Sequence, residues 1–423
     1  MIHYISTQGV GQPWVANELR VVGQAGIPFV LHAMRAPQHD LFTSDWARRM
    51  DDETRVLYPL PALRVALAGL LAPIRFGGRF WSALGNALFS ERESLKIRAT
   101  LLVHLAVACH WAHELRSGAV SHIHAQWAHS SASIGMYGAW LLGVPFSFTG
   151  HATDLFRHRC GLRDKIRRAE FIVCISEFHR EFFLSEGALP DQLEIVYCGI
   201  DVAQFAPPET RAPTAVPTIL SAGRLVEKKG FTDLIQSARI LRDRGIEFRC
   251  VIRGTGPLDD DLAAEIQRQG VGECVELVPS AVTQEAIPEF MAQGDVFCLA
   301  CVWATDDDVD GLPQLLMEAM ACGVPAVSTR LVGIPDLVED EVTGLLAEPN
   351  APDQLADRLQ RVLSDRELAS RLGDAGRARV VRMFDIDKCL EPLLSRYRQR
   401  LGVPQASVPT TNAHRSPQTS VRG

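Results

Sequence analysis

The chain has 423 residues, of which 47% are hydrophobic and 22% are charged, and its formal net charge is −7. This composition is typical of a soluble globular protein with two or three domains, and the acidic balance argues against a nucleic-acid partner, which normally requires a basic face. No run of about eighteen apolar residues is present, which excludes a transmembrane helix. The ten cysteines are scattered through apolar runs, and the first residues lack the features of a signal peptide. We therefore expect a cytoplasmic protein with reduced thiols.

The first half of the sequence alternates strand-like and helical patterns. A short strand at 2–5 is followed by a loop that contains Gly9 and Gly11, and a helical pattern starts at Trp14. This alternation indicates a parallel sheet and predicts a Rossmann-like domain over residues 1–205. Residues 40–117 are predicted to be largely helical. Further strands in this half are predicted at 26–31, 122–125, 145–149, 171–175 and 193–197.

The segment 63–81 mixes apolar residues with arginines and contains no acidic residue. Such a segment can lie on an anionic membrane surface. It can equally form a buried pair of helices with arginines at the rim, and the sequence leaves both interpretations open. A lipid-linked substrate would favour the membrane.

A proline-rich stretch at 206–217 predicts an inter-domain linker, and a second α/β series follows it. We expect a second Rossmann-like domain over 218–384, a C-terminal helix at 385–401 that crosses back to the first domain, and a disordered tail at 402–423. The predicted fold is therefore α/β, with two Rossmann-like domains and a cleft between them. The strands predicted in the second half lie at 218–221, 248–252, 275–278, 295–299 and 325–329.

Two cations follow the first strand of the second domain. Gly223 allows a tight turn after this strand, so that Arg224 and Lys229 can converge at its carboxyl end. Such a pair suits a diphosphate, whose negative charge grows as it leaves during a transfer reaction. Taken alone, the same residues could form a solvated turn.

Residues 310–323 contain two carboxylates on either side of a predicted helix start. Asp310 precedes Pro313, which suits a first helical turn, and Glu318 follows on the second turn. The unpaired N–H groups of a first turn make a ready anion site. The two carboxylates could therefore hold the hydroxyl groups of a sugar nucleotide on either side of its diphosphate.

This segment resembles the C-terminal signature of retaining glycosyltransferases of the GT-B type, family 4 (glycosyl transferases group 1). Its acidic loop is most similar to the branch that builds colanic acid and other exopolysaccharides. The family usually has glutamate where this sequence has Asp310, one methylene shorter. The resemblance implies that Glu318 binds the ribose, Asp310 the sugar, and Arg224 with Lys229 the phosphates. It also implies that the backbone around Gly311, Leu312, Pro313 and Gln314 contacts the donor, and that loops at Gly254 and Ser280 flank the base.

The resemblance extends to the first domain, where the spacing of Thr149-Gly150-His151-Ala152-Thr153-Asp154 matches a family element. It implies that His151 lies beside the donor sugar and the reacting centre, with a backbone carbonyl that steadies positive charge. Asp154, Gly9 and Gly11 are expected on the sugar or acceptor side. His122 and His124 share a strand face and could bind a metal. By resemblance we prefer to assign them to a polar wall of the cleft.

The predicted activity is that of a metal-independent, retaining hexosyltransferase without a cofactor. It would transfer a sugar from a nucleotide sugar to a glycan or polyprenyl-diphosphate-linked acceptor, at the inner face of the membrane. Asp306, Asp307 and Asp308 could suggest a metal site, but we expect a solvated acidic loop, because the cations at 224 and 229 replace the metal. Two alternatives remain: a sugar-nucleotide epimerase on the same fold, and a non-catalytic scaffold in a polysaccharide assembly.

Overall fold

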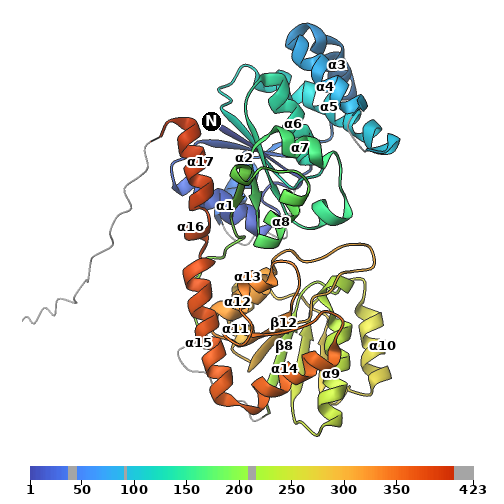
Figure 1. Ribbon diagram of the computed structural model, residues 1–423, viewed down its shortest axis with the longest axis vertical. Helices are drawn as coiled ribbons and strands as arrows, with labels where there is room; N and C mark the ends of the chain where they lie inside the picture. The colour runs from blue at the N-terminus through green and yellow to red at the C-terminus, as the bar shows by residue number, and fades with distance from the viewer. Residues whose placement is uncertain (37–44, 90–92, 208–215, 404–423) are drawn as a thin grey trace, which may run out of the picture.

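The computed structural model describes residues 1–36, 45–89, 93–207 and 216–403, and Figure 1 shows two α/β domains, one above the other. The expected linker and tail lie mostly outside these residues. The elements of the N-terminal domain are β1 (Ile2–Ser6), α1 (Pro13–Gln24), β2 (Phe29–Ala33), α2 (Asp45–Glu53), β3 (Arg55–Val56), α3 (Ala62–Phe76), α4 (Gly78–Phe89), α5 (Leu95–Leu115), β4 (His122–Gln126), α6 (Ser130–Leu142), β5 (Phe146–Gly150), η2 (Thr153–Arg157), α7 (Leu162–Arg168), β6 (Ala169–Cys174), α8 (Glu177–Ser185), η3 (Pro190–Gln192) and β7 (Leu193–Ile195).

The second domain begins with the strand at 218–222, and the last helices of the chain follow it. Its elements are β8 (Thr218–Ala222), η4 (Glu227–Lys229), α9 (Phe231–Asp243), β9 (Arg249–Arg253), α10 (Asp259–Gln269), β10 (Val275–Val278), η5 (Gln284–Ala286), α11 (Ile287–Met291), β11 (Val296–Leu299), α12 (Gln314–Ala321), β12 (Ala326–Thr329), α13 (Ile334–Leu337), β13 (Leu345–Ala347), α14 (Pro352–Ser364), α15 (Arg366–Met383), α16 (Ile386–Cys389) and α17 (Glu391–Leu401). Among the described residues, none of these helices combines the length and apolarity needed to cross a lipid bilayer.

Both sheets are parallel and doubly wound. Their strand orders are β3-β2-β1-β4-β5-β6-β7 and β10-β9-β8-β11-β12-β13. The order reverses direction at β1 in the first sheet and at β8 in the second, and ligands of such sheets bind where the carboxyl ends of the strands flank this switch point. Strands β1, β4, β5 and β8 are buried along their whole length, as expected for parallel strands covered by helices on both faces. The predicted α/β architecture of two Rossmann-like domains is therefore confirmed.

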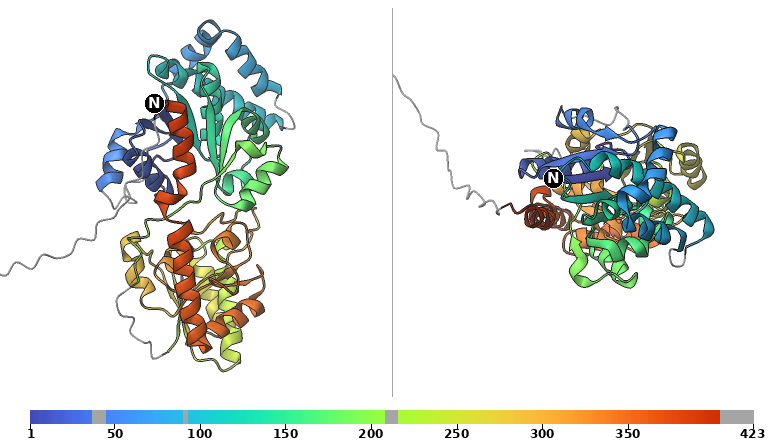
Figure 2. Two further views of the ribbon diagram at one scale, coloured as in Figure 1. Left: turned by 60° about the vertical axis from the view of Figure 1, so that its left-hand side comes forward. Right: turned by 90° about the horizontal axis from the view of Figure 1, so that it is seen from above.

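The C-terminal helices connect the two domains. Helix α15 packs on α12 in the second domain, and the chain then runs upward along one side of the molecule (Figure 2). In α17, the ring of Tyr397 packs against Tyr4 of β1, with the ring centroids 6.0 Å apart. Arg396 Nε donates to Glu194 Oε1 over 2.7 Å. The last described helix is thus held on the N-terminal sheet by an aromatic contact and an ion pair.

The acidic loop at 306–308 joins the two domains. The prediction that it is solvated is wrong for Asp308, whereas Asp306 and Asp307 are exposed. Thr153 Oγ1 of η2 donates to Asp308 Oδ1 over 2.7 Å, and Arg157 Nη2 lies 2.6 Å from Asp306 Oδ2. Asp308 is buried as a result. Asp306 and Asp308 thus find partners on the facing domain, which no local pattern in the sequence records.

The assignment of His122 and His124 to a polar wall of the cleft is also wrong. Both side chains are fully buried in β4. His122 Nε2 and His124 Nδ1 lie 2.6 and 2.7 Å from Ser147 Oγ of β5, and Phe171 stacks on both rings. No three His, Cys, Asp or Glu side chains within the described residues are grouped so that they could hold a metal ion.

Candidate active site

A cavity of about 260 Å³ lies between the two domains. Its walls come from both domains, from loops and helix starts on the carboxyl side of the strands. From the N-terminal domain the lining residues are Trp14, Trp127, His151, Ala152, Thr153, Ile175 and Cys198, and from the C-terminal domain they are Lys228, Lys229 and residues 309–315. The structure therefore brings His151, Lys229, Asp310, Gly311, Leu312, Pro313 and Gln314 together.

Lys228, Lys229 and Asp310 form the charged side of this cavity, and Asp308 lies behind them. Lys229 Nζ donates to Asp310 Oδ2. Lys228 Nζ lies 3.2 Å from Asp310 Oδ1 and 3.1 Å from Asp308 Oδ2. Burial acts to raise the pKa of Asp310, but attraction by the two lysines outweighs it and lowers that pKa. Burial acts to lower the pKa of Lys229, and Asp310 reverses this effect and raises it. Asp310 and Lys229 are thus held in their charged forms.

Two hydrogen-bond donors in the cavity wall have no acceptor. Trp14 Nε1 and Gln314 Nε2 are buried, and neither has a partner among the described residues. An unmatched buried donor is costly in a folded protein, and such groups are usually paired. Two such donors beside two lysines suit a ligand rich in acceptor oxygens, such as a phosphate or a sugar.

The side chain of His151 lies at the end of a buried hydrogen-bonded chain. Gln126 Nε2 donates to both oxygens of Glu18 over 2.9 Å. Gln126 Oε1 therefore faces His151 Nε2, at 3.3 Å, and acts as the acceptor. This arrangement places the ring proton of His151 on Nε2. Burial, followed by repulsion from His179 and His129, lowers the pKa of His151 to about 3. The imidazole is thus neutral, with Nδ1 as an acceptor, and cannot supply a proton at neutral pH.

The main-chain carbonyl of His151 already has a partner. His179 Nε2 of α8 donates to it, and His179 Nδ1 lies 2.6 Å from Ser176 Oγ. The expected use of a backbone carbonyl to steady positive charge would therefore compete with His179. Nδ1 of the His151 side chain is the group of this residue best suited to contact a sugar.

Asp154 lies under the loop that carries His151. Its Oδ2 accepts from Ala128 N at 2.5 Å, and its Oδ1 accepts from His151 N at 3.1 Å. Burial raises the pKa of Asp154 to about 6, although these backbone hydrogen bonds oppose the shift. The carboxylate therefore ties together the segments that follow β4 and β5. These contacts favour a role in ordering the loop over direct contact with hydroxyl groups.

We expect Asp154→Ala to lower the free energy of unfolding by about 2 to 4 kcal/mol, because it leaves two buried N–H groups without acceptors. Urea unfolding followed by circular dichroism measures this change. Asp191→Ala, at an exposed carboxylate, serves as the control and should leave stability unchanged. A stable Asp154→Ala protein that has lost its activity would instead indicate that this carboxylate touches the substrate.

The remaining predicted residues lie outside the cavity lining. Glu318 is buried in α12, where burial raises its pKa to about 7 despite a hydrogen bond with Gln284.

Gly254 lies in backbone contact with the Gly223 turn, and a side chain there would collide with the Gly223 carbonyl. Ser280 Oγ accepts from Arg253 Nε at 3.1 Å, on the adjoining loop. Arg224 is exposed, and Gly9 and Gly11 lie in the β1–α1 loop.

Sequence reasoning missed the aromatic side of the cavity and one lysine. The ring of Trp127 lies 4.5 Å from His151 and 6.1 Å from Trp14, and Trp127 Nε1 donates to Gln12 Oε1 over 2.8 Å. Trp127 adopts a φ of 77°, which is rare for a bulky residue and is often found at functional sites. Its position directly after β4, equivalent to that of His151 after β5, was the signal that could have found it. Lys228, the other missed residue, directly precedes the predicted Lys229 in the sequence.

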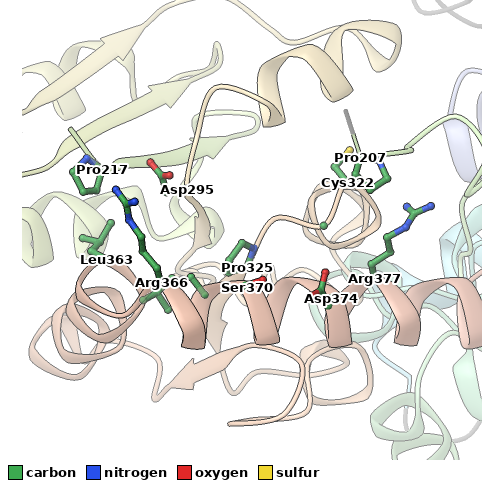
Figure 3. A pocket seen from close by; sticks show the side chains of 13 residues that line it. Pro207, Pro217, Asp295, Cys322, Pro325, Leu363, Arg366, Ser370, Asp374 and Arg377 are labelled. Carbon is green, nitrogen blue, oxygen red and sulfur yellow. The ribbon is translucent and has the colours of Figure 1, made fainter. Parts of the chain in front are cut away.

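A larger hollow of about 410 Å³ lies on the C-terminal domain, away from the cleft (Figure 3). Pro207 and Pro217 line it, together with Asp374 and Arg377 of α15. These two prolines flank the segment 208–215, which is outside the described residues. We therefore assign no ligand to this hollow.

Comparison with known proteins identifies two family models. The model described as Glycosyltransferase Family 4 matches residues 38–204, and the model described as Glycosyl transferases group 1 matches residues 203–379. Over 193 residues the chain is 35% identical to WcaL of Escherichia coli K12, named for colanic acid biosynthesis, and 35% identical to the amylovoran biosynthesis glycosyltransferase AmsK of Erwinia amylovora. Each alignment covers 46% of this chain and 47% of the relative, so the chain spans about half the length of the curated relatives it matches.

The fold also matches a solved structure. The crystal structure of Anabaena Alr3699/HepE in complex with UDP superimposes with a TM-score of 0.71 at 16% identity. The match covers 94% of this chain and 99% of that one. At this level of identity the comparison establishes the two-domain GT-B fold.

Proposed function

This chain belongs to the glycosyl transferases group 1 of glycosyltransferase family 4, and from that premise we propose that it is a retaining hexosyltransferase. It moves a sugar from a nucleotide sugar to a glycan or polyprenyl-diphosphate-linked acceptor in bacterial exopolysaccharide synthesis. The observation that most directly supports a nucleotide-sugar substrate is the inter-domain cavity. There, two lysines lie beside two buried N–H groups that have no hydrogen-bond acceptor among the described residues. The names of WcaL and AmsK support the choice of pathway.

In this proposal the donor diphosphate binds beside Lys229, with Lys228 and Arg224 adding positive charge. Gln314 Nε2 and the backbone N–H groups of Gly311 and Leu312 supply hydrogen bonds to it at the start of α12. Glu318 binds the ribose, and Asp310, which neutralises both lysines in the ligand-free protein, turns to the hydroxyls of the sugar. Fixed cations aimed at a leaving phosphate stabilise its growing charge without reorganisation, and can replace a metal ion.

The acceptor enters from the N-terminal side, past Trp14, Trp127 and His151. Neutral His151 contacts the donor sugar through Nδ1 and does not act as an acid. The acceptor hydroxyl attacks on the face from which the phosphate leaves, and the departing phosphate takes its proton, so the configuration at the anomeric carbon is retained. The contacts across the domain interface exclude water from this reaction.

A thermal-shift screen with UDP-, GDP- and ADP-sugars tests the proposal. Binding to the folded chain raises the melting temperature by an amount set by the ratio of ligand concentration to Kd. We expect one base to give a clear shift, and no shift with any of the three would contradict the proposal. Isomerised donor after incubation without an acceptor would favour the epimerase. Polymer synthesis that persists in cells carrying Asp310→Ala and Glu318→Ala would favour the scaffold.

Donor affinity should depend on pH through Glu318. Because burial raises its pKa to about 7, the carboxylate needed for the ribose forms only above that pH. We expect the affinity for the nucleotide sugar found in the screen to rise about tenfold between pH values of about 6 and about 8. The phosphodiesters of the ligand do not titrate in this range. Isothermal titration calorimetry measures the effect, and Glu318→Gln should bind weakly at every pH.

The same carboxyl group has an opposite effect on stability. Its pKa is higher in the folded than in the unfolded chain, so the unfolded chain ionises first as the pH rises. The contribution of Glu318 to stability is therefore complete at low pH and decreases until the pH reaches about 7.

A further inference from the structure

Helices α3 and α4 lie at the end of the N-terminal domain that is farthest from the C-terminal domain (Figure 1). Their large apolar side chains are exposed. We define this α3–α4 surface as Leu63, Leu67, Leu70, Leu71 and Ile74 of α3 with Trp81, Leu88 and Phe89 of α4. The α3 members follow the spacing of one helix face. Leu70, Ile74 and Phe89 are 75%, 82% and 75% exposed.

The exposure is not the result of loose packing. The opposite sides of the two helices are buried through Ala68 and Ala72 of α3 and through Ala83 and Ala87 of α4, and both helices pack on α5. Small side chains hold the helices close to the body, and the large apolar ones point away from it. Ten of the seventeen large apolar side chains that the described residues expose lie between 63 and 103. Apolar patches of this kind mark interaction surfaces.

The charged side chains that α3 and α4 themselves carry have one sign. The sequence from 54 to 90 contains no Asp or Glu, although the whole chain carries a net charge of −7. Arg64 and Arg79 are exposed on α3 and α4, and Arg75 is half-buried. Arg64 and Arg75 form no ion pair with any described residue. A second copy of the chain docked here about a twofold axis would bring these arginines together without carboxylates to pair them, so charge complementarity disfavours it.

We propose that the α3–α4 surface docks on the face of an anionic phospholipid bilayer. The leucines and Ile74 enter the boundary between head groups and acyl chains, Trp81 lies at the interface, and the arginines contact lipid phosphates. The surface lies outside the inter-domain cavity, so this proposal does not depend on the donor chemistry proposed above. It places the protein at the surface where a lipid-linked acceptor would be found.

Co-sedimentation with vesicles tests the proposal. We expect the full chain to sediment with vesicles of phosphatidylcholine mixed with phosphatidylglycerol, and to do so weakly with phosphatidylcholine alone. The double variant Leu70→Ser/Ile74→Ser should bind the mixed vesicles about tenfold or more weakly, because less apolar surface enters the membrane. Arg64→Gln and Arg75→Gln should each weaken binding about fivefold and reduce its sensitivity to salt.

The matched control is Leu189→Ser/Val342→Ser, which removes two exposed apolar side chains elsewhere and should bind like the wild type. The shift in melting temperature given by the nucleotide sugar should be unchanged in all of these variants, which separates this proposal from the proposed function. Failure of the wild-type protein to sediment with the mixed vesicles would overturn the proposal. A dimer in solution that Leu70→Ser/Ile74→Ser dissociates would overturn it too, in favour of a second copy.

Discussion

Replacement of Lys229 by alanine is expected to lower the rate of sugar transfer about 100- to 1,000-fold, the typical loss when one preorganised charge-stabilising group is removed. Lys229 Nζ lies in the inter-domain cavity and contacts Asp310. In the proposed reaction, negative charge grows on the leaving phosphate beside this ammonium group. The interaction is strongest in the transition state, so kcat should fall more than the affinity for the donor.

Steady-state kinetics with the donor found in the thermal-shift screen measure this effect. Lys388→Ala, which alters an exposed lysine on α16, is the control and should retain full activity. Lys229→Arg keeps the charge and should recover part of the rate, although the fork of a guanidinium differs in shape from an ammonium. If Lys229→Ala kept its activity within about threefold of the wild type, the diphosphate would have to bind elsewhere.

Gly230→Ala is expected to lower the free energy of unfolding by about 4 kcal/mol or more, which is exceptional for a single substitution. Gly230 joins η4 to α9 with a φ of 65°. A Cβ atom there would lie well inside contact distance of the carbonyl oxygen of Ala300, which belongs to the segment after β11. Both partners are backbone, so neither can move without shifting the loop that carries Lys228 and Lys229.

Gly245→Ala is a matched control. Gly245 has a similar φ of 74°, but a Cβ atom there would meet nothing within 4 Å. The substitution Gly245→Ala should therefore lower the free energy of unfolding by only about 1 kcal/mol, the cost of the left-handed conformation. Urea unfolding of both variants separates conformational strain from the steric clash. Equal losses of stability in the two variants would show that the contact with Ala300 is relieved easily.

Much of the fold follows from local patterns. The alternation of apolar runs with amphipathic stretches predicted two parallel α/β units, and the structure has them. The edge strands β3 and β13 were missed, since they have two and three residues and carry little periodicity. The start of α12 could also be located, because Pro313 ends the extended segment and the helix begins at Gln314. Such features depend on neighbours in the sequence.

The residues that line the inter-domain cavity could be predicted only in part. Asp310 and Lys229 were expected in one site, and the structure joins them by an ion pair. Their proposed roles in binding a donor stay predictions. Trp14 and Trp127 were not foreseen, because the edge-to-face contact between residues that follow β1 and β4 depends on these two strands being neighbours in the sheet.

His122 and Asp308 show most clearly what could not be predicted from the sequence. Both are polar residues in segments that read as solvated or cleft-lining, and both are buried in the folded chain. His122 finds Ser147 on the adjacent strand, and Asp308 finds Thr153 on the other domain. The sequence by itself determined most of the elements and the start of α12, since periodicity and helix capping are local. Only the tertiary structure decided which polar groups become partners, because burial and pairing depend on strand order and on how the domains meet.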